Sequence, residues 1–219
     1  MGVAARRERE KLERREAIVM AAEEVFRRRG LTDATMDEIA EAAEVSKGTL
    51  YLYFSGKDAL MVELLDRYTK GALEELSAAA DGADSGFSQI QRISRAMATF
   101  ALTHPQKFLL GTWWLMPGST DLDMEICGAY RERVGEIFAL FTHAILRGQN
   151  DGSIRRDIDP RRTAIQLWSA LRGVLLMDIN KDRLGKRLAQ TDSILPLADN
   201  FIEIFLQALK LHQPCGCAS

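Results

Sequence analysis

A short segment, residues 46–57, constrains the fold of this chain more than any other part of the sequence. It reads Ser-Lys-Gly-Thr-Leu-Tyr-Leu-Tyr-Phe-Ser-Gly-Lys, and its apolar residues Leu50 and Phe54 stand four positions apart, on one face of a helix. Helices shorter than roughly 12 to 15 residues are marginal alone in water, so this helix has to pack against neighbours through those two side chains. The other side chains in its middle therefore face outward.

The residues before this segment complete a compact helical motif. Thr35 and Glu38 have the spacing of a capping box, in which each side chain bonds to the other's backbone N–H at a helix start. Apolar residues follow at helical spacing, at Met36, Ile39, Ala40 and Ala43. Residues 44–45 leave room only for a tight turn before the next helix, so the pattern predicts a helix-turn-helix.

An earlier helix closes the core of this motif. Its apolar stripe consists of Ile18, Ala22, Val25 and Phe26. It stops at Gly30, a residue type suited to the left-handed position just after a helix. Three short helices are thus expected to enclose one small core.

With these motifs, residues from about 15 to 65 resemble the N-terminal DNA-binding domain of the TetR family of bacterial regulators. The resemblance implies a homodimer whose N-terminal domains bind double-stranded DNA at a palindromic operator. It also implies that the remaining helices form the dimer interface and a pocket for a small-molecule effector. The matching motifs are Phe26-x-x-x-Gly30, Thr35-x-x-x-Ile39-Ala40-x-x-Ala43-x-Val45-Ser46-x-Gly48-x-Leu50-Tyr51-x-Tyr53-Phe54 and Lys57-x-x-Leu60.

Four residues are candidates for contact with DNA phosphates. Thr35 and Ser46 begin helices, where free N–H groups and the helix dipole favour an anion, and this role is compatible with simple N-capping. Lys57 lies in the first turn of a helix, where a cation opposes the dipole by about 0.3 to 1 kcal/mol, so a phosphate partner is our hypothesis. The phosphate contact of Tyr53 is implied by the resemblance.

Base reading is assigned to the remaining outward residues of the same helix. Gly48 allows close backbone approach, Thr49 and Leu52 can touch a thymine methyl, and Lys47 can reach a guanine edge, with Tyr51 beside them. The helix carries no Arg, Asn or Gln, so DNA shape and deformability are expected to contribute part of the specificity. The operator sequence cannot be derived from these residues.

The formal net charge of −2 does not by itself predict DNA binding, but the N-terminus is locally basic. Its cations are Arg6, Arg7, Arg9, Lys11, Arg14 and Arg15. Such an arm can follow the DNA backbone or enter the minor groove. Three pairs, Arg6 with Glu10, Arg9 with Glu13 and Glu10 with Arg14, also have the spacing that supports a solvated helix, so both interpretations stand.

Beyond this region apolar residues recur at helical spacing, so the fold class is expected to be all-α. A long helix from residue 57 to about 81 leads out of the N-terminal domain, and a Gly, Asp and Ser cluster ends it. Asp159 and Pro160 read as an N-cap followed by proline at the first helical position. Further helices are expected at residues 87–103, from Pro105, at 121–146, at 160–179 and at 192–211, with loops at 116–119 and 148–152.

The expected domains are residues 1–65, the basic arm and helix-turn-helix domain, and 66–211, a helical ligand-binding and dimerisation domain. Residues 212–219 are expected to be a flexible tail. With 47% hydrophobic residues, the chain can bury two modest cores.

The last two helices carry more apolar surface than one chain needs. A surface helix needs an apolar arc of about 100° to meet its own core, and residues 192–211 exceed this. We expect the surplus to meet a second copy in a four-helix interface with twofold symmetry, the alternative being deep burial within the monomer. The interface candidates are Leu167, Leu171, Val174, Phe201, Ile202, Phe205 and Leu209.

Aromatic and thioether side chains gather between residues 87 and 177, and such a lining suits a hydrophobic or aromatic ligand. Ordinary core packing is the alternative for each of them. The pocket candidates are Met97, Phe100, Phe108, Trp113, Trp114, Met116, Cys127, Tyr130, Phe138 and Met177.

Other classes of protein find little support in the sequence. There is no glycine-rich phosphate loop, nucleophile elbow or His-x-x-x-His pair, so neither an enzyme nor a cofactor is expected. The C-terminal tail could bind metal or sense oxidation through His212, Cys215 and Cys217. Closed zinc sites normally have four ligands, however, so we expect these residues to form a frayed tail. No apolar run spans a membrane, which favours a cytoplasmic protein.

These observations predict a homodimeric transcriptional repressor, released from its operator by a small hydrophobic or aromatic ligand. A ligand-dependent activator and a ligand-independent architectural DNA binder are the alternatives.

Overall fold

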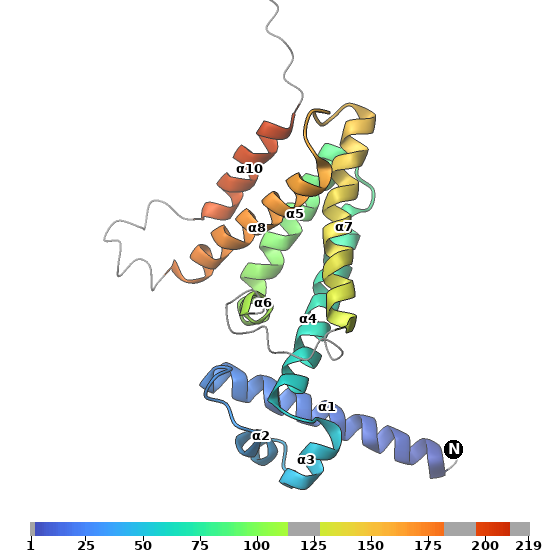
Figure 1. Cartoon of the computed structure of the whole chain (residues 1–219), viewed down its shortest axis with the longest axis vertical. Coiled ribbons are helices and arrows are strands. Elements are labelled where there is room, and N and C mark those ends of the chain that lie inside the picture. Colours follow the sequence, from blue (N-terminus) through green and yellow to red (C-terminus); the bar gives the residue numbers. More distant parts are fainter. Residues whose placement is uncertain (1–2, 114–127, 182–195, 211–219) are drawn as a thin grey trace, which may run out of the picture. The chain divides into compact units, whose positions relative to one another are not determined.

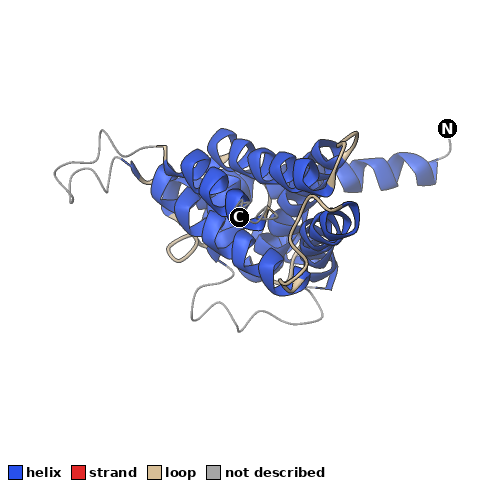
Figure 2. Cartoon of the chain, turned by 90° about the horizontal axis from the view of Figure 1, so that it is seen from above, coloured by secondary structure: helices blue, strands red, loops and turns tan. Residues whose placement is uncertain are grey.

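The computed structural model describes residues 3–113, 128–181 and 196–210, and these residues form helices and their connections without any strand (Figures 1 and 2). The all-α fold class is therefore confirmed. The chain divides into two compact units: Met1–Tyr68 with Trp114–Tyr130, and Thr69–Trp113 with Arg131–Ser219. The division falls inside α4 (Lys57–Ala80) and, further along, inside α7 (Gly128–Asp151).

The first unit contains α1 (Val3–Arg29), α2 (Met36–Ala42), α3 (Lys47–Tyr53) and the start of α4. Gly30 has a φ of +82° and its N–H donates to the Phe26 carbonyl at 2.9 Å, as expected of a glycine that ends a helix. Side chains from all four helices form its core, including Ile18, Val25, Ile39, Leu50, Leu60 and Leu64, each with no exposed surface.

Local backbone signals in the helix-turn-helix are confirmed. The Thr35 hydroxyl accepts from the Glu38 N–H at 3.2 Å while the Glu38 carboxylate accepts from the Thr35 N–H at 3.1 Å, which completes the capping box. The turn before α3 is made by Glu44, whose φ of +53° lies in the left-handed region, and by Val45, whose N–H donates to the Ala40 carbonyl.

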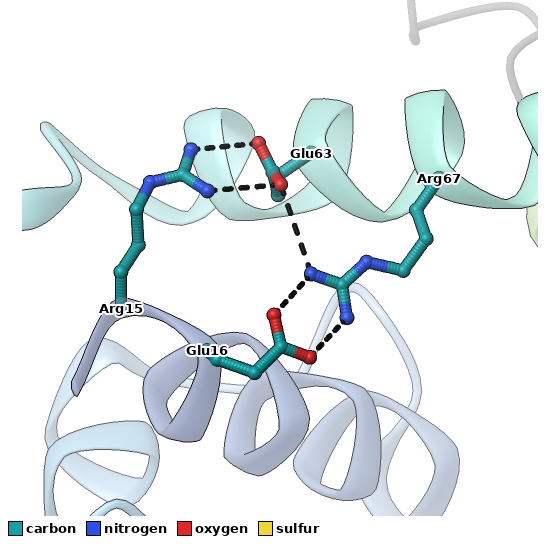
Figure 3. A network of polar contacts seen from close by, with 4 residues as sticks. All are labelled: Arg15, Glu16, Glu63 and Arg67. Carbon is teal, nitrogen blue, oxygen red and sulfur yellow. Dashed lines mark hydrogen bonds and ion pairs between the residues drawn. The ribbon is translucent and has the colours of Figure 1, made fainter. Parts of the chain in front are cut away.

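Four alternating charges join α1 to the start of α4 (Figure 3). The Arg15 guanidinium donates to both carboxylate oxygens of Glu63 at 2.9 and 2.7 Å, and Arg67 donates to both oxygens of Glu16 at 2.6 and 2.7 Å. Arg67 also lies 3.8 Å from Glu63. These bonds hold the pKa of each carboxyl below its usual value. Arg15 therefore belongs to this network rather than to the basic arm.

The second unit contains the rest of α4, α5 (Gly86–Thr103), α6 (Pro105–Trp113), most of α7, α8 (Pro160–Ile179) and α10 (Leu197–Leu209). Helices α5, α8 and α10 pack against one another, and α7 contributes Phe141 and Ile145 to the same core. The Asp159 carboxylate accepts from the Arg162 N–H at 2.6 Å ahead of Pro160, so the predicted cap of α8 is confirmed.

Two glycines allow α5 and α7 to touch backbone to backbone. A Cβ atom on Gly86 would lie 2.0 Å from the Gly148 nitrogen and 2.5 Å from the Ala144 carbonyl oxygen. The Gly86 N–H also donates to the carboxylate of Asp151 at 2.7 Å. The sequence interpretation of residues 148–152 as a loop was therefore wrong for residues 148–151: α7 continues to Asp151, and Gly148 serves helix packing.

A buried carboxylate of α8 caps α10. Pro196 precedes α10 and provides no side-chain cap. Instead Asp178, which is buried, accepts from the N–H groups of Leu197 and Ala198, both at 2.9 Å. The start of α10 is thus fixed by a residue of another helix.

No helix in the described ranges is both long and apolar enough to cross a membrane. The expected loop at 116–119 and the tail at 212–219 lie outside these ranges, as do the first residues of the helices expected at 121 and 192.

Candidate nucleic-acid interface

Helix α3 is held on its unit in the way its sequence indicates. Leu50 is fully buried and Phe54 is 4% exposed, so these two side chains anchor the helix. The Ser46 hydroxyl accepts from the Thr49 N–H at 3.0 Å and caps the first turn. The helix is thereby presented with a fixed orientation on its three-helix support.

The opposite face of α3 is open. Leu52 is 84% exposed, the highest value among the large apolar residues of the described chain, and Tyr51 is 46% exposed. Lys47 and Gly48 are exposed beside them, while Thr49 and Tyr53 are half-buried. All the positions that sequence reasoning assigned to DNA therefore have surface on the first unit, and their contacts with DNA stay predictions.

Lys47 has a partner that sequence reasoning missed. Its ammonium lies 2.6 Å from the carboxylate of Asp37, in α2, and this contact raises the pKa of Lys47. Both side chains are more than half exposed, and such surface pairs contribute little to stability. Lys47 can therefore exchange Asp37 for a nucleic-acid acceptor at small cost.

Lys57 also has partners of its own. Its ammonium donates to the carbonyl oxygens of Thr32 at 3.0 Å and Ala34 at 3.2 Å, in the connection between α1 and α2. These bonds explain a cation in the first turn of α4 without a phosphate. The inference from the helix dipole is therefore no longer needed, and contact of Lys57 with a phosphate rests on the family resemblance.

Thr35 and Thr49 use their hydroxyls within the protein. The Thr35 hydroxyl belongs to the capping box, and that of Thr49 lies 2.8 Å from the Ser46 hydroxyl. The Thr49 methyl group remains for the thymine contact considered from sequence.

The aromatic candidates for a ligand pocket separate into distinct places. Met97, Phe100 and Phe108 are buried in the second unit. Phe138 is partly buried, whereas Met177 is 50% exposed and lies at the surface of α8. Tyr130 is buried but belongs to the first unit. The Trp113 side chain and residues Trp114, Met116 and Cys127 lie outside what the structure describes.

An arginine that sequence reasoning did not single out lies among these aromatic residues. Arg172 donates to the Gly111 carbonyl at 2.7 Å and to the Thr112 hydroxyl at 2.8 Å. Its guanidinium lies 4.3 Å from the Trp168 ring centre and 5.3 Å from that of Phe108. The sequence feature that could have pointed to Arg172 is its position four residues after Trp168, on a mostly apolar helix.

The interface candidates on α8 and α10 are only partly available to a second copy. Leu167 and Leu171 are fully buried and Ile202 and Leu209 are 2% and 4% exposed, so the chain's own core covers them and their assignment to an interface is corrected. The physical reason is that α8 and α10 pack on each other and on α5. Apolar surface remains on Val174, Phe201 and Phe205, and more fully on Ile165 and Ile204.

Helices α2 and α3 form the helix-turn-helix, and α3, the second of the two, has an exposed outer face. This arrangement is that of DNA-binding proteins of the helix-turn-helix class. Residues 18–64 match the family described as bacterial regulatory proteins of the tetR family. The helix-turn-helix region of this chain is therefore similar to the DNA-binding region of this family of transcriptional regulators.

The relatives extend this finding. The chain is 27% identical over 193 residues to the HTH-type transcriptional repressor DhaR of Mycobacterium sp. strain GP1, a match that covers 85% of this chain and 94% of DhaR. It is 50% identical over 56 residues to the HTH-type transcriptional activator FasR of Mycolicibacterium smegmatis, covering 26% of each chain. The crystal structure of the regulator FadR from Bacillus subtilis in complex with stearoyl-CoA shares the fold, with a TM-score of 0.67 at 16% identity over 90% of this chain and 99% of FadR.

Proposed function

We propose that this protein is a homodimeric transcriptional repressor that reads a palindromic operator with α3 and leaves it when a small hydrophobic or aromatic molecule binds the second unit. The observation that carries the proposal is the outward face of α3, where Leu52, Tyr51 and Lys47 are exposed on a buried two-residue anchor. As its target is bacterial operator DNA, the protein would act in the cytoplasm.

The dimer follows from how helix-turn-helix proteins meet DNA. One copy of α3 covers one half-site, and two copies related by a twofold axis reach half-sites about 34 Å apart, one turn of the duplex. The apolar surface left on Ile165 and Ile204, 46% and 63% exposed, supports α8 and α10 as the contact between copies. A change in the spacing of the two recognition helices then changes DNA affinity.

The effector site is supported by the cluster around Arg172. The rings of Phe138 and Trp168 lie 4.7 Å apart, and Phe108 and the guanidinium of Arg172 adjoin them in the second unit. Aromatic walls with a single cation suit an apolar molecule that carries an acidic or carbonyl group. The FadR structure, which holds stearoyl-CoA, shows that one protein of this fold accepts a ligand of this kind.

Repression is favoured by DhaR, because that relative matches nearly the whole chain. Activation is the second candidate, since FasR, an activator, is 50% identical to this chain over 56 residues. A helix-turn-helix domain serves either sign of regulation, so the sign depends on where the operator lies.

A selection from a random pool of duplex DNA tests the DNA-binding part. The expected result is an enriched palindrome with half-sites about one helical turn apart. Leu52→Ala should change the preferred bases, while Tyr53→Phe should weaken binding to selected and random duplexes alike. Enrichment without symmetry would favour an architectural binder, and absence of any retained DNA would refute the proposal.

Release from the selected duplex tests the effector. Stearoyl-CoA and a series of aromatic carboxylic acids would be titrated onto the complex, and at least one should displace the protein. Trp168→Ala should reduce this response without changing affinity for the free duplex. If no compound displaces the protein while DNA binding stays intact, the result would favour a ligand-independent DNA binder.

A further inference from the structure

The N-terminal part of α1 is exposed within the described part of the structure. Every residue from 4 to 14 is exposed, although the helix is continuous from Val3 to Arg29. Figure 1 shows α1 running on past α2 and α3 toward the N-terminus. We call residues 4–14 the arm.

One face of α1 changes from apolar to basic where the helix extends beyond the core of the first unit. In the packed half, Ile18, Ala22 and Val25 have no exposed surface and face the core of the first unit. Counting back four, seven and eleven residues from Ile18 keeps the same face of the helix and gives Arg14, Lys11 and Arg7. The stripe that is apolar against the protein's own core therefore continues as a basic stripe beyond it, and we call these three residues the basic stripe.

The other cations of the arm are already neutralised. Arg6 lies 2.8 Å from Glu10, and Arg9 lies 3.7 Å from Glu13. Within the described residues, none of the three members of the basic stripe has an ion pair. Glu10, at the right spacing for Arg14, is bonded to Arg6 instead.

In the protein alone, the basic stripe lowers the stability of the N-terminal part of α1. Arg7 and Lys11 are four residues apart, and like charges at this spacing destabilise a helix by about 0.2 to 0.5 kcal/mol. A polyanion along the stripe would turn this repulsion into attraction. The charge pattern thus fits a partner with regularly spaced negative charges.

The stripe begins beside the recognition helix. Arg14 lines a surface groove of the first unit together with Ser46 and Thr49, at the start of α3, and the carboxylates of Glu10, Glu13 and Glu44 line the same groove. From residue 14 to residue 7 the helix rises about 10 Å, at 1.5 Å per residue. This length matches about three base pairs of duplex, at 3.4 Å each.

We propose that the arm is a rigid DNA clamp in which Arg7, Lys11 and Arg14 bind phosphates of the duplex next to the segment that α3 reads. The stripe adds sequence-independent affinity and lengthens the footprint of each protomer beyond its half-site. The proposal rests on DNA binding by α3, but on neither the effector nor the sign of regulation.

A pair of matched double variants tests the clamp in the full-length protein. Arg7→Gln with Lys11→Gln removes two charges of the stripe, and Arg6→Gln with Arg9→Gln removes two neutralised charges of the same arm. Glutamine has a helix propensity close to that of arginine and lysine, so both variants keep the helix, which circular dichroism checks. Binding to a duplex of random sequence is measured by fluorescence anisotropy between 50 and 200 mM NaCl.

The slope of log affinity against log salt should become shallower by about 1.8 per protomer in the stripe variant, at 0.9 per phosphate contact. Over this fourfold range of salt, its affinity should therefore change about tenfold less than that of the wild-type protein. The Arg6 and Arg9 variant should keep most of the wild-type slope. Equal slopes for the two variants, or a stripe variant that behaves as wild type, would overturn the clamp while leaving DNA binding by α3 intact. A wild-type protein that binds no duplex would instead refute the proposed function, and the clamp with it.

Discussion

The buried carboxylate of Asp178 should be worth more to stability than an ordinary helix cap. Asp178→Ala leaves the N–H groups of Leu197 and Ala198 without their acceptor at the start of α10. A buried donor left unsatisfied costs about 1 to 3 kcal/mol, and because the Ala198 N–H is buried and the Leu197 N–H only partly so, the pair costs at most about 6 kcal/mol. Removing a buried charge and fraying the first turn of α10 into water offset part of this cost, so we expect about 3 kcal/mol.

Asp159→Ala is the matched control, because it removes the same side chain from the same kind of position. Asp159 caps α8 through one N–H and is exposed, so water can replace it and the expected cost is about 1 kcal/mol. Asp178→Asn keeps one acceptor oxygen and should fall between the two alanine variants.

Urea unfolding followed by circular dichroism, at one fixed protein concentration because of the proposed dimer, measures these differences. The midpoint should fall in the order wild type, Asp159→Ala, Asp178→Asn, Asp178→Ala. If Asp178→Ala costs no more than Asp159→Ala, the reasoning that buried tertiary capping holds α10 in place is wrong.

Three further perturbations test other parts of the structure. Gly86→Ala should destabilise the second unit by at least about 1 to 3 kcal/mol, because its Cβ would overlap the backbone of α7. Gly71→Ala, in open space within α4, should stabilise the protein by about 0.5 to 1 kcal/mol. The melting temperatures of the two variants should therefore move in opposite directions. Glu63→Gln should lower stability at neutral pH and less in acid, because the bonds to Arg15 hold the folded-state pKa of Glu63 below its ordinary 4.5. The contribution of Glu63 is full above 4.5 and is lost progressively as the pH falls from there through the lower folded-state pKa. Melts at pH 7 and at steps below pH 4.5 should show the gap between wild type and variant closing, and a constant gap would contradict this. Lys57→Met should lower the melting temperature even without DNA, through loss of its two carbonyl contacts, and an unchanged melt would leave phosphate binding as its only role.

The parts of the fold that depend on neighbouring residues could be predicted from the sequence. The capping box of Thr35, the end of α1 at Gly30 and the cap at Asp159 each involve atoms within a few positions of one another. The anchor residues Leu50 and Phe54 followed from the same short-range logic, since a helix so short has only one way to be held.

What could not be predicted depends on residues far apart in the chain. Gly148 lies in a glycine, asparagine and aspartate stretch that is typical of a loop, and only contact with Gly86 shows why it is helical. The partners of Lys57, Asp178 and Arg172 are likewise set by tertiary packing. Burial of the interface candidates on α8 and α10 required knowing that these two helices cover each other.

The crossing at Gly86 and Gly148 also limits how the second unit can deform. Two backbones in direct contact cannot slide past one another without collision, so shear between α5 and α7 is blocked at this end. A rotation of the two helices about this crossing would displace their far ends, near Thr103 and Arg131, the most. A molecule bound between those ends would therefore change the separation of the helices more than one bound near the crossing.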